Sequence, residues 1–438
     1  MRKWLGATLL AASVATPVST APLESSIRPA MRPHEAGSEI ILAAATIRPQ
    51  ARPSSPVDLQ PLPAASNQRF QNWIRAFRGR AMSQGISAAT LDRAFQNVTY
   101  DADVIRRDRN QSEFTKTIWE YLDSAASDTR IKNGKAALRK HRKKLDAIER
   151  TYGVEKEVVV AVWGLESAYG SYKGDMDVIR SLSTLAFDGR RGKFFEQQLI
   201  AALKILQAGD VAPRNMTGSW AGAMGHTQFI PTSYLAYAVD FTGDGKRDIW
   251  SDDPSDALAS TAAYLKRFGW KKGQPWGVEV KLPQGFNYAL AKRSVTKTPN
   301  QWSRLGVTGI DGRKVPNYGK GAILLPAGGK GAAFMVFKNF SVIERYNAAD
   351  AYVIGVGHLS DRIKGGKPIQ ADWPRGDRAL TFKERKELQQ RLTRAGFDTR
   401  GIDGKIGPNT ITAVRAYQSA SGLVPDGYPS LSLLKRLR

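Results

Sequence analysis

The chain has 438 residues, 42% of them hydrophobic, which is enough for about two or three domains with sizeable cores and excludes a disordered polymer. Its 65 Lys and Arg outnumber its 40 Asp and Glu, and the formal net charge of +25 predicts an anionic partner. There is no cysteine, which excludes disulfides and a cysteine-linked lipid anchor.

Residues Met1 to Ala15 have the pattern of a secretion signal: a short positive segment, an apolar stretch too short to span a bilayer, and then small residues. Ala15 and Ala21 both suit cleavage, and we take 1–21 as the signal peptide. No later segment has a transmembrane pattern. We therefore expect an exported, periplasmic protein, and behind a signal peptide the positive charge favours the anionic cell envelope over nucleic acid.

A linker is predicted over residues 22–66, which are rich in Pro, Ala and Ser and have no sustained helical or strand period. The fold is expected to begin at Asn67. Apolar side chains then fall at helical spacing, which indicates a packed helix: Phe70, Trp73, Ile74 and Phe77.

Further helices are predicted along the body of the chain. One spans Arg130 to Arg150, with a dense Lys/Arg face that is either solvated or in contact with anionic glycan. Another runs from Phe194 to Ala208, and a third follows Pro254 and reaches Leu265. From 277 to 340 the pattern changes to short apolar runs with many glycines, which predicts strands or irregular structure attached to the helical body.

Glu166 places one carboxyl group in an otherwise apolar helical run from Val158 to Gly170. Burial disfavours the charged form of a carboxyl group, and a buried glutamate can become a proton donor near neutral pH. Glu166 is thus a candidate general acid. The alternative is a helix-terminal glutamate that faces solvent just before Gly170.

The segment from Ser219 to Pro231 combines small residues with an amide. Glycines and alanines permit close approach of the backbone, and Gln228 can both donate and accept hydrogen bonds. Such a segment can line a sugar groove. Its alternative is tight packing around small residues.

The loop Asp240-Phe-Thr-Gly-Asp-Gly-Lys-Arg-Asp248 resembles the opening half of an EF-hand calcium loop. Asp240, Thr242 and Asp244 occupy its first, third and fifth positions, and the Lys246 carbonyl would serve the seventh. The twelfth position holds Ser251 in place of the usual Glu. A turn rich in Asx residues is the alternative.

A proline and glycine interruption near Trp373 to Asp377 predicts a domain boundary, with one domain over 67–375 and a compact helical tail over 376–438. The tail carries an apolar pattern of its own: Leu388, Leu392, Phe397, Val414 and Tyr417.

Taken together, the motifs resemble those of the B-type family of lytic murein transglycosylases. They are Trp163-Gly-Leu-Glu-Ser-Ala-Tyr-Gly170, the Ser219–Pro231 segment, the Asp240 loop and Glu344-Arg-Tyr-Asn347. The tail resembles a peptidoglycan-binding module through Ile402-Asp-Gly-Lys-Ile-Gly-Pro408 and Ala413-Val-Arg-Ala-Tyr-Gln418. The resemblance implies a mainly α protein: a lysozyme-like catalytic domain with a small β or irregular subdomain, and a three-helix peptidoglycan-binding domain.

The resemblance also assigns roles to individual residues. Glu166 would be the catalytic acid, and Asp256 would supply the closing carboxylate of a structural calcium site, with no cofactor required for the chemistry. We expect a monomer whose partner is peptidoglycan. Flat rings, hydroxyls and amides suit sugars, although any one of these tyrosines is otherwise a core residue; the implied substrate contacts are Ser219, Gln228, Tyr264, Tyr346, Asn347 and Tyr352.

An ordinary glycosidase needs two carboxyl groups, and nothing in the spacing of Asp175, Asp177, Asp188 or Glu196 marks a partner for Glu166. The resemblance implies that the 2-acetamido group of the substrate takes the second role, and that a 1,6-anhydro end is released. Three alternatives stay open: a hydrolytic lysozyme, an inactive wall-binding scaffold and, weakened by the signal peptide, a nucleic-acid binder.

Overall fold

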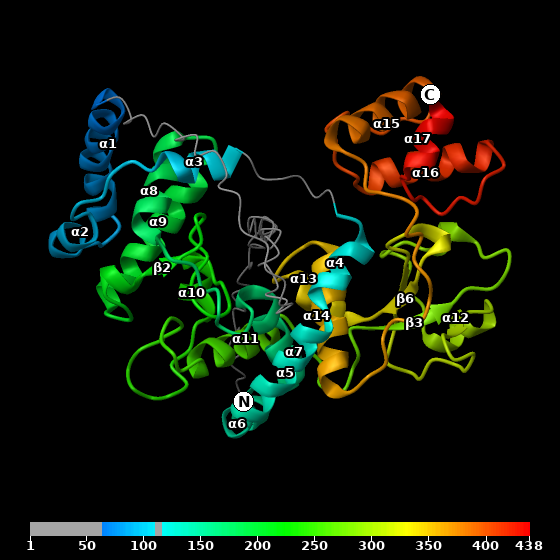
Figure 1. Ribbon diagram of the computed structural model, residues 1–438, viewed down its shortest axis with the longest axis horizontal. Helices are drawn as coiled ribbons and strands as arrows, with labels where there is room; N and C mark the ends of the chain where they lie inside the picture. The colour runs from blue at the N-terminus through cyan, green and yellow to red at the C-terminus, as the bar shows by residue number, and fades with distance from the viewer. Residues whose placement is uncertain (1–63, 110–115) are drawn as a thin grey trace, which may run out of the picture.

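The computed structural model describes residues 64–109 and 116–438, so the expected signal peptide and nearly all of the expected linker lie outside the described residues. The expectation of a mainly helical chain with small sheets is confirmed (Figure 1). The helices are α1 (Ala64–Met82), α2 (Ala88–Ala94), α3 (Ala102–Arg109), α4 (Ile118–Ala125), α5 (Asp128–Lys140), α6 (Arg142–Tyr152), α7 (Lys156–Ser167), α8 (Val178–Asp188), α9 (Gly192–Ala208), α10 (Pro231–Tyr237), α11 (Ser255–Arg267), α12 (Pro299–Arg304), α13 (Lys338–Glu344), α14 (Asp350–Lys364), α15 (Phe382–Arg394), α16 (Pro408–Ala420) and α17 (Leu431–Leu437).

The helices of the body form one large core. At one end α1 buries Phe70, Ile74 and Phe77, as their spacing predicts, and packs on α8, which in turn pairs with α9. In the centre α7 is packed between α5, α6, α11 and α14. The central position of α7 explains its apolar sequence, because a helix covered on all sides has no face for polar residues.

The basic segment predicted as one helix over 130–150 is divided into α5 and α6 at His141. The His141 amide still donates to the Ala137 carbonyl, but its backbone leaves the helical region at φ −105° and ψ 18°. Its ring lies edge-on to Trp163 at 5.5 Å between centroids. This tertiary contact, with a residue of α7, gives no signal in the sequence of the segment itself.

The predicted strands form an antiparallel sheet in the order β4 (Thr308–Gly309), β3 (Gly277–Lys281), β6 (Ala333–Val336) and β5 (Ala322–Leu324). Successive side chains of a strand point to opposite faces. In β6, Phe334 and Val336 therefore join the helical core, while Ala333 and Met335 join a second core around Trp302. A further pair, β1 (Met176–Asp177) and β2 (Thr217–Gly218), lies beside α8.

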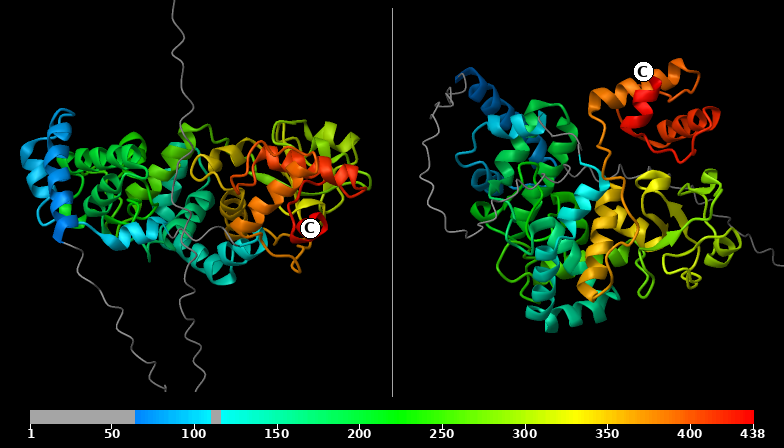
Figure 2. Two further views of the ribbon diagram at one scale, coloured as in Figure 1. Left: turned by 90° about the horizontal axis from the view of Figure 1, so that it is seen from above. Right: turned by 45° about the vertical axis from the view of Figure 1, so that its right-hand side comes forward.

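The tail folds as α15, α16 and α17 around its own core, which includes Leu388, Val414 and Leu434. It lies at the opposite end of the molecule from α1, next to the sheet (Figure 2). Hydrogen bonds within the described part of the chain join it to the body: the Gly329 amide donates to Asp426 Oδ2 at 2.8 Å, and Arg415 donates to the Ala291 carbonyl at 2.8 Å.

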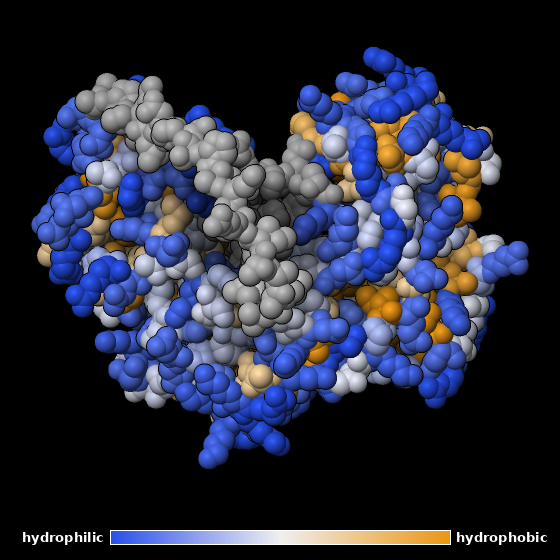
Figure 3. Space-filling model, viewed as in Figure 1, coloured by the Kyte–Doolittle hydropathy of each residue, from blue (hydrophilic) through white to orange (hydrophobic). Residues whose placement is uncertain are grey.

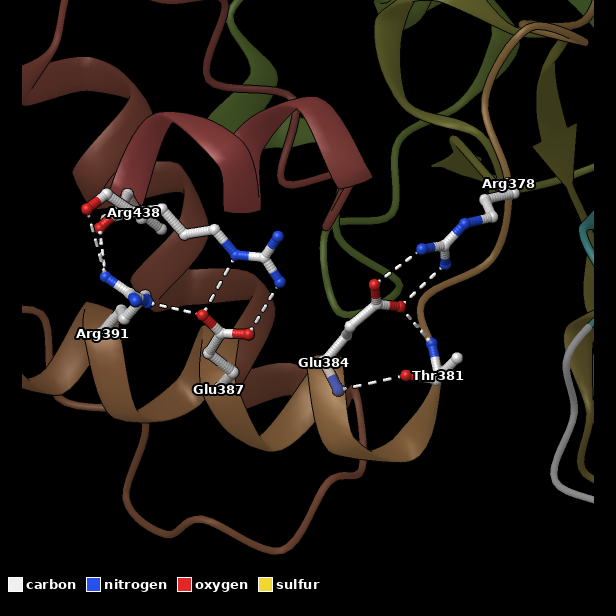
Figure 4. A network of polar contacts seen from close by, with 7 residues as sticks. Arg378, Thr381, Glu384, Glu387, Arg391 and Arg438 are labelled. Carbon is white, nitrogen blue, oxygen red and sulfur yellow. Dashed lines mark hydrogen bonds and ion pairs between the residues drawn. The ribbon is translucent and has the colours of Figure 1, made fainter.

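A polar network fixes the first helix of the tail (Figure 4). Thr381 and Glu384 form a capping box, and Arg378 donates twice to the Glu384 carboxylate, at 2.6 and 2.7 Å. These hydrogen bonds, first of all those from Arg378, lower the pKa of Glu384 to about 2. At the other end of α15, Arg438 and Arg391 share Glu387, which ties the last residue of the chain to the helix.

The face shown in Figure 3 is mostly hydrophilic, with hydrophobic residues gathered over the tail and the sheet. Within residues 64–109 and 116–438, no helix combines the length and the apolar character needed to cross a bilayer.

Candidate active site

Glu166 lies in the last turn of α7, after eight consecutive buried residues from Val158 to Leu165. Its own side chain is half-buried. The hydroxyl of Tyr352, on α14, donates to Glu166 Oε1 at 2.7 Å, and the Tyr352 side chain is only 2% exposed. A rigid partner therefore holds the carboxyl group at the edge of the core, where one side of it can meet a ligand.

The chain leaves α7 through a left-handed turn. Ala168, Tyr169 and Gly170 have φ values of 48°, 60° and 88°, a region that Ala and Tyr rarely adopt. Ser167 supports the turn: its hydroxyl accepts from the Gly170 amide at 3.0 Å and donates to the His226 carbonyl at 2.6 Å. Strained backbone directly after a glutamate is typical of a functional site.

His226 clamps this end of α7. Trp163 Nε1 donates to His226 Nδ1 at 3.2 Å, so the ring proton is on Nε2, which donates to the Ser251 carbonyl at 2.7 Å. Burial lowers the pKa of His226 and favours this neutral form. Trp163 and Ser167 lie on either side of Glu166 along the helix, and both are bonded to His226. His226 therefore fixes the position of Glu166 from both sides.

The segment after β2 folds as a tight irregular loop, and the expected close approach of its backbone is confirmed. A Cβ atom on Gly225 would lie 2.2 Å from the Ile249 carbonyl oxygen. Gln228 adopts φ 54°, and its Nε2 donates to the carbonyls of Lys173 and Gly225, both at 2.9 Å. Among the described residues no donor reaches Gln228 Oε1, whereas Ser219 Oγ accepts from the Ala223 amide.

The three tyrosines expected to contact sugar are all buried, and the Tyr352 side chain is 2% exposed. Tyr346 is 1% exposed and its hydroxyl donates to the Thr227 carbonyl at 2.7 Å. Tyr264 is also buried, and its hydroxyl donates to the Arg345 carbonyl. A covered ring cannot stack on a sugar. Of the predicted set, Tyr352 contacts Glu166, and the Asn347 side chain accepts from the Ala349 amide.

Tyr121, on α4, was not predicted. Burial and, to a lesser degree, the nearby Glu166 carboxylate raise its pKa well above the ordinary range. Gly355 of α14 leaves room for its ring, since a Cβ there would lie 3.0 Å from it. No local pattern around Tyr121 marks it, because it lies near Glu166 only through the packing of α4 against α14.

The other carboxyl groups considered as partners of Glu166 serve elsewhere. Asp177 caps α8 by accepting from the Arg180 amide at 3.0 Å. Asp188 pairs with Arg109 at 2.8 Å, and Glu196 pairs with Arg80 at 2.8 Å. Asp175 is exposed on the surface. Three of the four candidates are thus engaged in a helix cap or an ion pair, and the fourth is exposed, so none of them is marked as a second acid for Glu166.

Three carboxylates of the Asp240 loop converge. Oxygens of Asp240, Asp244 and Asp256 lie within 4.8 Å of one another. Burial raises the pKa of Asp256, and the Asp240 charge adds to this. Thr242 Oγ1 lies 3.3 Å from Asp240 Oδ1, and the Lys246 amide donates to Asp244. The all-oxygen donor set fits a hard divalent cation such as calcium, which would relieve the crowding of like charges.

A helical body with one tyrosine-bound glutamate at a helix end, joined to a small sheet, suits an enzyme that cleaves glycans by acid catalysis. Residues 69–361 match the model of the transglycosylase SLT domain, and residues 383–437 match that of a putative peptidoglycan binding domain. The chain belongs to the SLT-domain transglycosylase family, and the predicted family resemblance is confirmed.

The chain is 33% identical to membrane-bound lytic murein transglycosylase B of Escherichia coli K12 over 241 residues, which are 53% of this chain and 63% of that protein. It thus spans less than two thirds of the length of that relative. Among solved structures, SltB3 from Pseudomonas aeruginosa in complex with NAG-anhNAM-pentapeptide has 50% identity and a TM-score of 0.82, with 84% of this chain and 99% of that chain covered. The Escherichia coli lytic transglycosylase Slt35 in complex with calcium has 28% identity and a TM-score of 0.58, with 68% and 94% covered.

Proposed function

We propose that the protein is a lytic transglycosylase that cleaves the β-1,4 bond between N-acetylmuramic acid and N-acetylglucosamine in peptidoglycan and forms 1,6-anhydromuramyl ends. The observation that carries this proposal is the half-buried Glu166, held by Tyr352 and without a second carboxyl group among the four candidates. The anhydromuramyl ligand of the SltB3 complex supports the same product.

In this reaction Glu166 protonates the glycosidic oxygen, and the bond from that oxygen to the muramyl C1 breaks. The substrate's 2-acetamido group stabilises C1. Glu166, now a carboxylate, takes the proton of the muramyl 6-hydroxyl as its oxygen closes onto C1, which returns the acid to its starting form. Tyr352 keeps its hydrogen bond to Oε1 through both steps, and the free Gln228 Oε1 is placed to accept from a sugar hydroxyl or amide.

Mass spectrometry of digested, purified peptidoglycan tests the proposal. An anhydro product is lighter by one water than the product of a hydrolytic lysozyme. Products that carry a reducing muramic acid would instead support the hydrolytic alternative. Complete absence of products from a folded enzyme would support a wall-binding scaffold.

We further propose that the Asp240 loop holds a structural calcium ion, with Asp240, Thr242, Asp244, Asp256 and the Lys246 carbonyl as ligands. A calcium complex exists for the related Slt35. The ion would cross-link the loop to the start of α11 and takes no part in the chemistry.

Calcium is expected to raise the thermal midpoint of metal-stripped protein, because a ligand bound only by the native state adds about 2.7 kcal/mol at about a hundredfold excess over its Kd. Asp244→Ala removes this increment. Asp372→Ala, at an exposed carboxylate outside the loop, retains it. Scanning calorimetry with and without millimolar calcium measures both; an unchanged wild-type midpoint would leave only the Asx-rich turn.

We propose domains over 67–375 and 376–438, and action as a monomer in the periplasm, where the tail attaches the enzyme to the wall. The separate core of the tail supports this division. Deleting 377–438 is expected to weaken sedimentation with insoluble wall by about 100-fold, because two linked modules raise the local concentration of each other's ligand.

Cleavage of short soluble glycans by the truncated chain is expected to stay near the full-length rate. The deletion removes the hydrogen-bond partners of the exposed Gly329 amide and of the Ala291 carbonyl, and neither residue belongs to the site around Glu166. Equal losses in the two assays would show that the tail completes the catalytic fold.

A further inference from the structure

A cavity of about 640 Å³ lies between the sheet and the C-terminal half of α14. Its walls are β3, the segment 309–316 and the segment 366–370. Asp361 lines it, nine residues after Tyr352, and about two and a half turns of helix place the two residues on opposite faces. The cavity is therefore separate from the site around Glu166.

The interior is apolar with two polar groups. Trp276 and Phe334 are buried beside it, and Trp276 Nε1 donates to Asp361 Oδ2 at 2.8 Å. His358 has no hydrogen bond to any described residue. Burial raises the pKa of Asp361 to about 6 and lowers that of His358 to about 4. Both groups thus sit in a desolvated wall, and each retains an atom for a ligand's N–H group.

The rim is cationic. Lys314, Lys364 and Lys367 are exposed there, and none of them forms an ion pair within the described part of the chain. The acidic residues of the rim are engaged: Asp311 accepts from Arg313 at 2.7 Å, and Glu279 accepts from the amides at 370 and 371. The open charges at the mouth are therefore positive.

We propose that this cavity binds a short peptide with free carboxylates and an ammonium group. The carboxylates meet the rim lysines, aliphatic side chains pack against the partly exposed Val278, Ile310 and Ile369, and the ammonium group donates to Asp361. A volume of this size suits a small ligand, since such sites measure about 300–1,000 Å³. The choice of a cell-wall peptide rests on the function proposed above. The preference for a ligand with carboxylates rests on the lysines of the rim instead.

Isothermal titration of the full-length chain with the free tripeptide L-Ala-γ-D-Glu-diaminopimelate tests the proposal. The double variant Lys364→Ala/Lys367→Ala is expected to weaken binding by about tenfold, which is about 1.4 kcal/mol, since each of these exposed charges contributes only modestly. The matched control is Lys193→Ala/Lys204→Ala, which removes two exposed lysines of α9. Asp361→Asn, checked for folding by circular dichroism, is expected to lower affinity as well.

The same tripeptide with its carboxylates amidated is expected to lose binding. Wild-type chain that fails to bind the free tripeptide at millimolar concentration, or a rim variant that binds as tightly as its α9 control, overturns the proposal. Cleavage of peptide-free glycan by the wild-type chain is measured in parallel. Cleavage without peptide binding refutes only the proposal that the cavity binds a peptide. Peptide binding without cleavage refutes only the proposed reaction.

Discussion

Replacing Glu166 by Gln is expected to lower the turnover of peptidoglycan by about 10⁴-fold, the upper range for loss of a general acid. The amide keeps the shape of the side chain, and its oxygen still accepts the hydrogen bond of the Tyr352 hydroxyl. The variant should therefore fold and bind glycan normally. Release of anhydromuramyl products, followed by mass spectrometry, measures the loss.

Glu157→Gln is the matched control, because Glu157 lies in the first turn of the same helix. It is expected to cleave like the wild type. A folded Glu166→Gln protein with near wild-type turnover would move the acid role to another residue.

His226→Phe is expected to have the second largest effect. An aromatic ring is kept, but the Trp163 indole N–H loses its partner inside the protein, while the Ser251 carbonyl keeps only the longer hydrogen bond from Lys173, at 3.4 Å. Leaving the buried indole N–H unpaired costs about 1–3 kcal/mol, and a shift of the α7 end can lower kcat by about 100-fold. KM should change much less, because His226 acts through the position of Glu166.

A positioning role also predicts a pH signature. Burial lowers the pKa of His226 in the folded state below its usual 6.5, so the unfolded chain binds the proton more readily. The neutral His226 ring makes its whole contribution to the free energy of unfolding above pH 6.5. This contribution is lost as the pH falls through the folded-state pKa. The difference in unfolding free energy between wild type and His226→Phe should shrink across this window. His226→Gln, with one donor and one acceptor, should recover part of kcat; a pH-independent difference and no recovery would indicate packing alone.

The sequence was sufficient to predict the helical body, the strand region, the compact tail and Glu166 as the one acid in an apolar helix. These predictions rest on the spacing of apolar residues and on a polar residue that stands in an otherwise apolar run. Both signals can be read within a short segment of the sequence. The two carboxylates that start the Asp240 loop were found in the same way, from their positions within one short segment.

The contacts around Glu166 could not be predicted locally. Tyr121 and His226 reach the site from distant segments, and only the packing of α4, α7 and the loop after β2 brings them together. The aromatic ring of Tyr346 was also ambiguous in the sequence, because such a ring suits either a sugar-binding surface or a hydrophobic core. In the structure the side chain is 1% exposed and lies in the core.

Strand β6 has a consequence for how the protein opens. Its alternate side chains belong to two cores at once, the helical core through Phe334 and the core around Trp302 through Met335. The strand cannot separate without exposing both. Its amide protons should therefore exchange with solvent deuterium only through openings close to global unfolding, so that body and sheet form one cooperative unit, whereas the tail exchanges independently.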